Sequence, residues 1–128
     1  MNDNFNAART ILVVDDDEHV RAAAAALIED LGFKIIEADC GAAALDILET
    51  GNADIDLIFS DVKMPPGITG YELAHEVKQQ WPNVPILLTS GYYDGGFNAG
   101  DDDGAFPLLP KPYKLSELTA ALKGAFAL

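Results

Sequence analysis

The sequence predicts an α/β protein: a doubly wound, five-stranded parallel sheet with helices on both faces. Two observations predict this class. Five short apolar runs alternate along the chain with stretches of helical spacing that have the right length for crossover connections. The last apolar run, "AFPLLP" (105–110), carries two prolines, which cannot donate to a ladder and therefore favour an edge position for this strand.

The first strand and helix carry clear signals. The run "TILVVD" (10–15) is apolar and rich in β-branched residues, which is typical of a buried strand. Helical spacing then begins at residue 17, and Gly32 stands where a helix C-terminal cap is expected. The helix predicted over 17–31 places five apolar residues on one face: Val20, Ala24, Leu27, Ile28 and Leu31.

The later elements repeat this alternation, with Gly51 and Pro82 as stop signals after two of the helices. The further strands are predicted over residues 34–38, 56–60, 84–89 and 105–110. The further helices are predicted over residues 41–50, 70–81 and 115–127. The segment 92–105 has the position of the fourth crossover helix, but it holds four glycines and three adjacent aspartates. Its composition predicts a loop, so we expect a short or disordered fourth helix.

The prolines of the last run, Pro107 and Pro110, also predict the strand order. An edge position for this strand agrees with the flavodoxin-like order 2-1-3-4-5, in which strands 1 and 3 are neighbours at the switch point. Ligands of such sheets bind beyond the carboxyl ends of the strands. The expected fold is therefore a flavodoxin-like sheet in a single domain, residues 10–128, preceded by a flexible segment, residues 1–9.

Composition narrows the classes of function. The chain of 128 residues has 21 acids against 8 bases, a net charge of −13, which argues against direct binding to nucleic acid or to anionic membranes. The single cysteine, Cys40, cannot form an internal disulfide, and the amino terminus lacks the apolar stretch of a signal peptide. No apolar run is long enough to span a bilayer, so we expect a soluble, cytoplasmic protein.

Chemically active side chains stand at the ends of the predicted strands. Strand 1 leads to Asp15 and Asp16, strand 3 to Asp61, strand 4 to Thr89, and strand 5 to Lys111. Because parallel strands end at the same edge of a sheet, we expect these groups in one crevice. Clustered carboxylates suit Mg²⁺, and Mg²⁺ beside a lysine neutralises phosphoryl oxygens. Asp61, delivered by the central strand, is a candidate nucleophile that would form an acyl phosphate.

Each of these residues also has a structural interpretation. Asp16 or Asp17 could cap the first helix, where an acid suits the helix dipole. Asp61 could be a turn residue before the prolines that follow it, Thr89 an ordinary strand residue, and Lys111 a solvated surface lysine. Their convergence at one sheet edge favours a common functional site over four independent structural roles.

Four motifs resemble the receiver domain of two-component response regulators: "ILVVDDDEHVR", "LIFSDVKMP", "PILLTSGY" and "LPKPY". They occur in the family's order at fitting intervals, and the resemblance covers residues 10–127. The style of "SDVKMPPGITGYEL" with "LLTSGY" is similar to the receivers attached to hybrid histidine kinases.

The resemblance implies a role for each site residue. Asp61 is the phosphoacceptor, and Mg²⁺ is bound directly by Asp16 and largely through water by Asp15. Asp61 itself and the backbone carbonyl of Lys63 complete the implied metal site. Thr89 is the switch hydroxyl that turns toward the phosphoryl group.

The resemblance also covers the residues around strand 5. Lys111 pairs with the phosphoryl group and precedes Pro112 in what is usually a cis peptide bond. The family's aromatic switch position, three residues before this lysine, is Leu108 here, and Phe106 is the nearby aromatic residue. Leu108 and Phe106 are therefore the possible output residues, and the resemblance does not imply the usual readout through an aromatic residue at position 108.

A receiver of this kind is a signalling switch rather than an enzyme that acts on a metabolite. It would accept a phosphoryl group from a histidine kinase or a phosphotransfer protein, change the surface around strands 4 and 5 to control a downstream partner, and hydrolyse its own acyl phosphate slowly. The alternative is a degenerate receiver that binds a partner without phosphorylation. A phosphohydrolase of the haloacid dehalogenase type would need a second acid two residues after Asp61, where this chain has Lys63.

Overall fold

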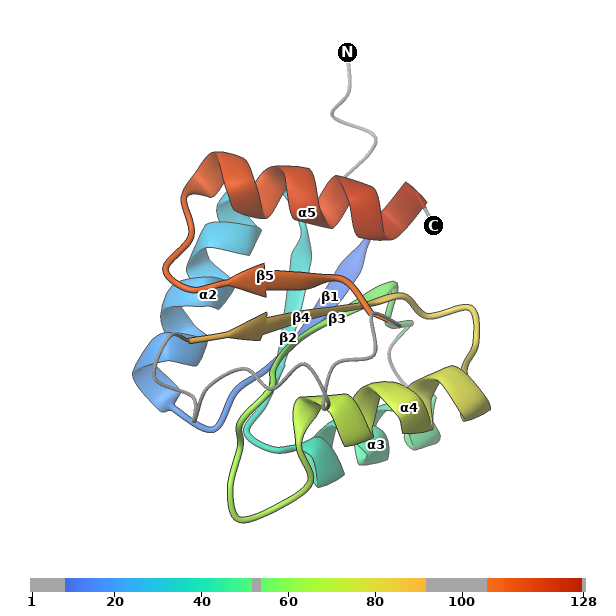
Figure 1. Ribbon diagram of the computed structural model, residues 1–128. Helices are drawn as coiled ribbons and strands as arrows, with labels where there is room; N and C mark the ends of the chain where they lie inside the picture. The colour runs from blue at the N-terminus through green and yellow to red at the C-terminus, as the bar shows by residue number, and fades with distance from the viewer. Residues whose placement is uncertain (1–8, 52–53, 92–105, 128) are drawn as a thin grey trace.

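The apolar runs of the sequence form one parallel five-stranded sheet, seen in a computed structural model that describes residues 9–51, 54–91 and 106–127 (Figure 1). The strands are β1 (Thr10–Val14), β2 (Lys34–Ala38), β3 (Leu57–Asp61), β4 (Ile86–Ser90) and β5 (Leu108–Pro110). The helices in the described residues are α2 (Glu18–Asp30), α3 (Gly41–Thr50), α4 (Gly70–Gln80) and α5 (Leu115–Ala127). The predicted flexible segment 1–9, apart from Arg9, and the predicted fourth crossover segment 92–105 lie outside these residues.

The strand order is β2-β1-β3-β4-β5, and all neighbouring strands are parallel. The predicted flavodoxin-like order is therefore confirmed, and β5, which ends at Pro110 and follows Pro107, lies at an edge. The ladder pairs Val14 with Ser60 and Asp61 with Thr89, so the carboxyl ends of β1, β3 and β4 lie side by side. This register decides which side chains meet beyond the sheet.

Helices cover both faces of the sheet: α2 and α5 lie on one face, and α3 and α4 lie on the other (Figure 1). Alternate residues of β1 feed two separate cores, because successive strand side chains point to opposite faces. Leu12 and Val14 belong to the core under α3 and α4, whereas Ile11 and Val13 belong to the core under α2 and α5. The central strands β1 and β3 are buried along nearly their whole length, which makes the tip of β3 a rigid support.

The predicted buried face of the first helix was wrong at two positions. Val20 and Leu27 are 38% and 36% exposed, and the buried residues of α2 are Ala24, Ala25 and Ile28. The run of alanines at 22–26 is apolar on every side, so helical spacing could not select one face. Small side chains at Ala24 and Ala25 let the helix lie close to the sheet, which leaves the larger Val20 and Leu27 outside.

Strand boundaries differ from the prediction where long-range pairing decides them. Strand β3 extends through Asp61 because this residue pairs with Thr89 of β4. Asp56, predicted as the first residue of that strand, instead ties down the start of β1: its carboxylate accepts a hydrogen bond from the Thr10 N–H at 2.7 Å. Strand β5 begins at Leu108 rather than at residue 105. Across the described part of the chain, no helix combines the length and the apolarity needed to cross a membrane.

Candidate functional site

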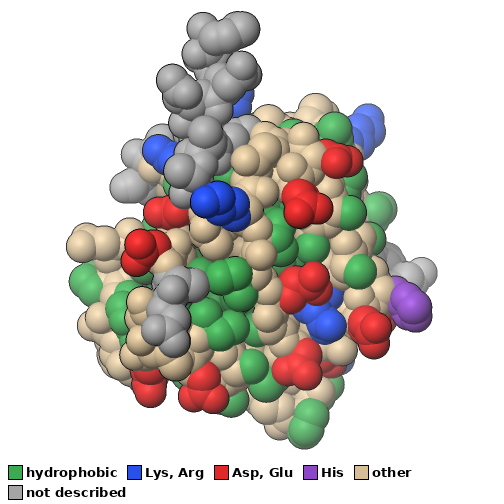
Figure 2. Space-filling view, turned by 180° about the vertical axis from the view of Figure 1, so that it is seen from behind, with side chains coloured by type: hydrophobic (Ala, Val, Ile, Leu, Met, Phe, Trp, Pro, Cys, Tyr) green, Lys and Arg blue, Asp and Glu red, His purple; other side chains and the backbone are tan. Residues whose placement is uncertain are grey.

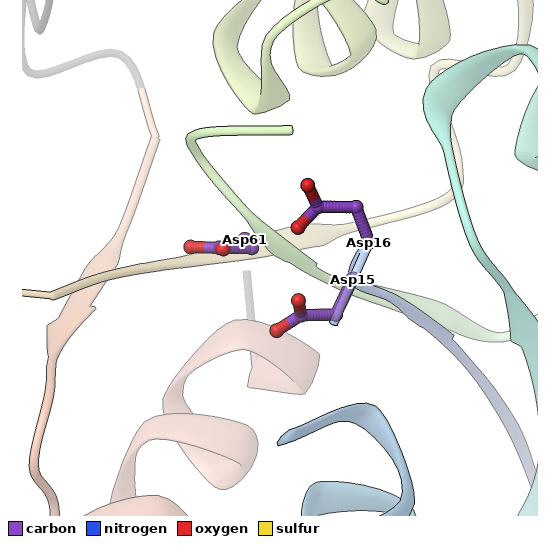
Figure 3. A group of neighbouring side chains, drawn as sticks. All are labelled: Asp15, Asp16 and Asp61. Carbon is purple, nitrogen blue, oxygen red and sulfur yellow. The ribbon is translucent and has the colours of Figure 1, made fainter. Parts of the chain in front are cut away.

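Three carboxylates meet at the carboxyl edge of the sheet. Asp15 and Asp16 follow β1, and Asp61 ends the neighbouring strand β3 (Figure 3). One carboxylate oxygen of each lies within 4.8 Å of the others; Asp15 and Asp61 are buried, and Asp16 is exposed. The parallel register brings the acids together, as the strand order requires. Hard oxygen donors so close to one another suit Mg²⁺ and repel one another without a cation.

Lys111 supplies a positive charge to this cluster from the edge strand. Its ammonium nitrogen lies 3.5 Å from Asp61 Oδ1 and 3.6 Å from Asp15 Oδ2. The Lys111 N–H donates to the Ser90 carbonyl at 2.9 Å, which continues the β4–β5 pairing beyond the last ladder residue. The peptide bond between Lys111 and Pro112 is cis, as the resemblance predicts. The lysine therefore bridges two of the three acids rather than lying free on the surface.

Burial is the main influence on the pKa of Asp15. Removal from water raises the pKa of this carboxyl above its ordinary value; the hydrogen bond from the Asp17 N–H and the charge of Lys111 oppose this rise, and the charges of Asp16 and Asp17 add to it. The Asp17 N–H donates to Asp15 Oδ1 at 2.9 Å. Relative to the unfolded chain, the folded protein therefore favours the protonated form of this carboxyl group.

Replacing this carboxylate should stabilise the metal-free protein. A raised pKa means that the folded state binds the proton more tightly than the unfolded state, so stability falls as pH rises through the folded pKa of Asp15. Asp15→Asn keeps the acceptor for Asp17, and we expect a higher melting temperature than wild type at neutral pH in a chelator. The gain should shrink as pH falls toward the ordinary Asp pKa of 3.8. Thermal unfolding across pH measures it, and Asp46→Asn, exposed on α3, is the control. A lower melting temperature for Asp15→Asn at neutral pH would contradict this account.

The helix-cap interpretation applies to Asp17 and not to Asp16. Asp17 Oδ1 accepts hydrogen bonds from the backbone N–H groups of His19 at 2.9 Å and Val20 at 3.1 Å. The bond from Val20 is the largest cause that lowers the pKa of Asp17. Since the neighbouring residue caps α2, Asp16 can place its carboxylate in the acidic cluster.

Thr89 lies opposite Asp61 in the ladder, but its hydroxyl is engaged elsewhere. The buried hydroxyl donates to the Leu109 carbonyl at 2.7 Å, and so links β4 to β5 through a side chain. This bond joins the strand that flanks Asp61 to the edge strand that leads to Lys111.

The loop after Asp61 is pinned at both ends. The Val62 N–H donates to Asp61 Oδ1 at 2.9 Å and orients this carboxylate, and the Gly70 N–H donates back to the Val62 carbonyl at 2.7 Å. Thr69 and Glu72 form a capping box at the start of α4, a pattern that the sequence signal T-x-x-E could have revealed. The Lys63 side chain is exposed in this loop, and the role of its carbonyl stays a prediction.

The two possible output residues lie on the α4 side of the sheet. Leu108 and Phe106 are half-buried and pack on the core under α3 and α4. The Phe106 ring meets His75 edge-on, with ring centroids 5.0 Å apart, and lies 5.7 Å from the Lys78 ammonium. His75 is an exposed residue of α4, and its ring is held against the segment before β5.

Sequence reasoning missed two residues beside the acids. The Arg21 guanidinium donates to the backbone carbonyl of Asp15 at 2.8 Å. Tyr113 packs its ring edge-on against Phe59, with centroids 6.1 Å apart, and its pKa is raised by burial and by the negative charges of Asp15 and Asp61. Each is the last residue of a motif quoted above, "ILVVDDDEHVR" for Arg21 and "LPKPY" for Tyr113, but no spacing rule indicates which atoms they reach.

Comparison with known proteins gives a consistent result. A model of the response regulator receiver domain matches residues 11–123. The chain is 31% identical over 121 residues to sensor kinase CckA of Brucella abortus, which covers 94% of this chain and 13% of the relative. It is 36% identical over 114 residues to response regulator MprA of Mycobacterium sp. strain KMS, which covers 88% of this chain and 48% of the relative. The chain thus spans less than half the length of these curated relatives.

Solved structures share the fold. The receiver domain of the hybrid histidine kinase CckA has a TM-score of 0.72 at 32% identity, over 91% of this chain and 98% of that one. The response regulator TrrA of Thermotoga maritima, solved in complex with Mg²⁺-BeF, has a TM-score of 0.78 at 27% identity, over 91% of this chain and 98% of that one. A receiver domain protein from Clostridium thermocellum has a TM-score of 0.79 at 27% identity, over 93% and 94% of the two chains.

Proposed function

Because the chain belongs to the response regulator receiver family, we propose that it is a phosphorylation-dependent switch with Asp61 as its phosphoacceptor. Receivers are phosphoacceptor domains of two-component systems and generally not catalytic enzymes. The observation that carries the assignment to Asp61 is its place: a buried carboxylate at the tip of a central strand, beside Lys111 and two further acids.

The proposed reaction is attack of an Asp61 carboxylate oxygen on phosphorus. The new O–P bond forms as the N–P bond of a phosphohistidine breaks, and the electron pair leaves with the histidine of a kinase or phosphotransfer protein. Lys111 lies close enough to Asp61 to neutralise charge on the phosphoryl oxygens in the product. Val62 orients the attacking carboxylate through its N–H. Later attack of water on the acyl phosphate would give slow self-dephosphorylation.

The donor set fits Mg²⁺. Asp15, Asp16 and Asp61 offer hard oxygen ligands, two of them buried, and the Lys63 carbonyl follows Asp61 closely in sequence. When bound, Mg²⁺ would supply positive charge to the phosphoryl oxygens. The complex of the relative TrrA with Mg²⁺-BeF supports this assignment.

The proposed switch starts at Thr89. Its hydroxyl would leave the Leu109 carbonyl and donate to a phosphoryl oxygen on Asp61, since Thr89 and Asp61 are ladder partners. Loss of that bond would free the β5 backbone next to Leu108, and Phe106 with its contacts to α4 would carry the change to the surface. A partner protein that binds around β4 and β5 would sense this change.

The surface charge supports a protein partner rather than nucleic acid. Acidic side chains are spread over much of the face seen in Figure 2, and the chain carries a net charge of −13. Such a surface repels a phosphate backbone at physiological salt. The proposed donors are therefore a histidine kinase or a phosphotransfer protein, and the output is a protein contact.

Labelling with a small phosphodonor tests the proposal. Incubation of the wild-type chain with acetyl phosphate and Mg²⁺ should add one phosphoryl group per chain in the intact mass spectrum. Hydroxylamine should remove it, because it cleaves acyl phosphates, and a chelator should prevent its addition. A chain that binds Mg²⁺ yet stays unlabelled would instead be the degenerate receiver.

A further inference from the structure

We propose that Arg21 is a positioning residue for the metal site, and that it acts by fixing the backbone at the tip of β1. This inference rests on the proposed function of the acidic cluster. The Arg21 guanidinium donates two hydrogen bonds through different nitrogens. Nη1 donates to the Asp15 backbone carbonyl at 2.8 Å, and Nε donates to Glu37 Oε1 at 2.9 Å. The Arg21 side chain is 16% exposed, so most of its length is enclosed.

These contacts tie three elements together. Arg21 lies in the first turns of α2, Asp15 directly follows β1, and Glu37 belongs to the edge strand β2. The Asp15 N–H donates to the Ala38 carbonyl of β2 at 3.2 Å, so Arg21 and β2 hold Asp15 by both of its peptide groups. The Asp15 carboxylate is oriented in turn by the Asp17 N–H.

The site requires such a clamp for two reasons. Three consecutive aspartates follow β1, and their mutual repulsion favours rotation of this segment away from the compact arrangement. Mg²⁺ demands nearly ideal octahedral geometry, so Asp15 and Asp16 must be held within about 0.5 Å of their productive positions. A guanidinium can hold a carbonyl and a carboxylate in fixed directions at the same time, which a lysine ammonium on a flexible stem cannot.

Charge and position predict opposite results when Arg21 is replaced. Arg21→Gln removes a positive charge beside a cation site, so an electrostatic role alone would make Mg²⁺ bind more tightly. Loss of positioning should weaken binding, by about tenfold or more, as for other residues that orient metal ligands. We expect the weaker binding, measured by isothermal titration of the full chain with MgCl₂. Arg21→Lys keeps the charge but lacks the planar guanidinium group, so its Mg²⁺ binding should be weaker than that of wild type as well.

Two comparisons separate this effect from a general loss of charge or stability. Lys34→Gln removes the same charge from an exposed position of β2 and should leave Mg²⁺ affinity unchanged or slightly higher. Glu37→Gln keeps the Arg21 bond to Asp15 but weakens the anchor behind it, so its affinity should lie between wild type and Arg21→Gln. Thermal unfolding in a chelator identifies any variant that is not folded. If Arg21→Gln is not folded, the Mg²⁺ affinity of Glu37→Gln tests the inference instead.

A measurement without metal tests the positioning role of Arg21 independently of the proposed function. Amide hydrogen exchange of Asp17, whose N–H is bound to Asp15 Oδ1, should be faster in Arg21→Gln than in wild type without Mg²⁺. A wild-type chain that binds no Mg²⁺ would refute the proposed function, and this exchange rate would still decide the clamp. Folded Arg21→Gln with unchanged Asp17 exchange, or with Mg²⁺ affinity equal to or above wild type, would overturn the inference.

Discussion

Asp61→Asn is expected to reduce labelling by acetyl phosphate and Mg²⁺ to the background of the unreacted protein. The amide oxygen of asparagine is neutral and a far weaker nucleophile than a carboxylate, so no acyl phosphate forms at this position. The amide oxygen of this variant can still accept the Val62 N–H, so the loop after β3 should keep its anchor. Intact mass spectrometry of variant and wild type under the same conditions measures the difference.

The design needs a control for charge and a control for folding. Asp46→Asn removes one negative charge from an exposed position of α3 that does not belong to the acidic cluster, and it should label like wild type. The melting temperature of Asp61→Asn in a chelator should not fall, because one of three clustered carboxylates has lost its charge. Full labelling of Asp61→Asn would assign the phosphoryl group to another residue and refute the proposed site.

The sheet and the meeting of the acids could be predicted from sequence because a few rules determine them. Parallel strands end at one edge, and prolines 107 and 110 favoured an edge position for the last strand. Once the order is set, the acids after β1 and β3 have to be neighbours. The contact of Lys111 with two of these acids follows from the same topology.

Other features depended on contacts that sequence spacing does not encode. Asp16 and Asp17 are adjacent and identical, so the sequence does not show which of them caps α2. The backbone conformation at the start of the helix makes Asp17 the cap. Arg21 donates to a backbone carbonyl, which every residue has, so the type of the accepting residue gives no indication of this contact. The contact of Phe106 with His75 joins segments thirty-one residues apart, and no local pattern predicts it.

Gly70, the first residue of α4, is expected to be far less replaceable than Gly67 in the loop after β3. A Cβ at this position would lie 2.3 Å from the Asp61 carbonyl oxygen and 2.9 Å from the Val62 Cα, both backbone atoms. The start of α4 therefore packs directly on the segment that carries the proposed phosphoacceptor, and the Gly70 N–H bonds the Val62 carbonyl there. Any side chain at 70 has to push the helix away from β3 or displace Asp61.

The sign of the effect distinguishes this contact from helix propensity. Alanine is the better helix former by up to about 1 kcal/mol, so propensity alone predicts that Gly70→Ala stabilises the protein. The clash predicts the opposite, a loss of about 1–3 kcal/mol, as for other overpacked sites. Because displacement of Asp61 also disturbs its neighbours, labelling by acetyl phosphate should slow as well.

Gly67→Ala is the matched control, since a Cβ there has no atom within 4 Å, and it should change stability by less than about 0.5 kcal/mol. Denaturant unfolding and labelling rates of the two variants test both effects. If Gly70→Ala proved as stable and as reactive as Gly67→Ala, the start of α4 would not fix the position of Asp61.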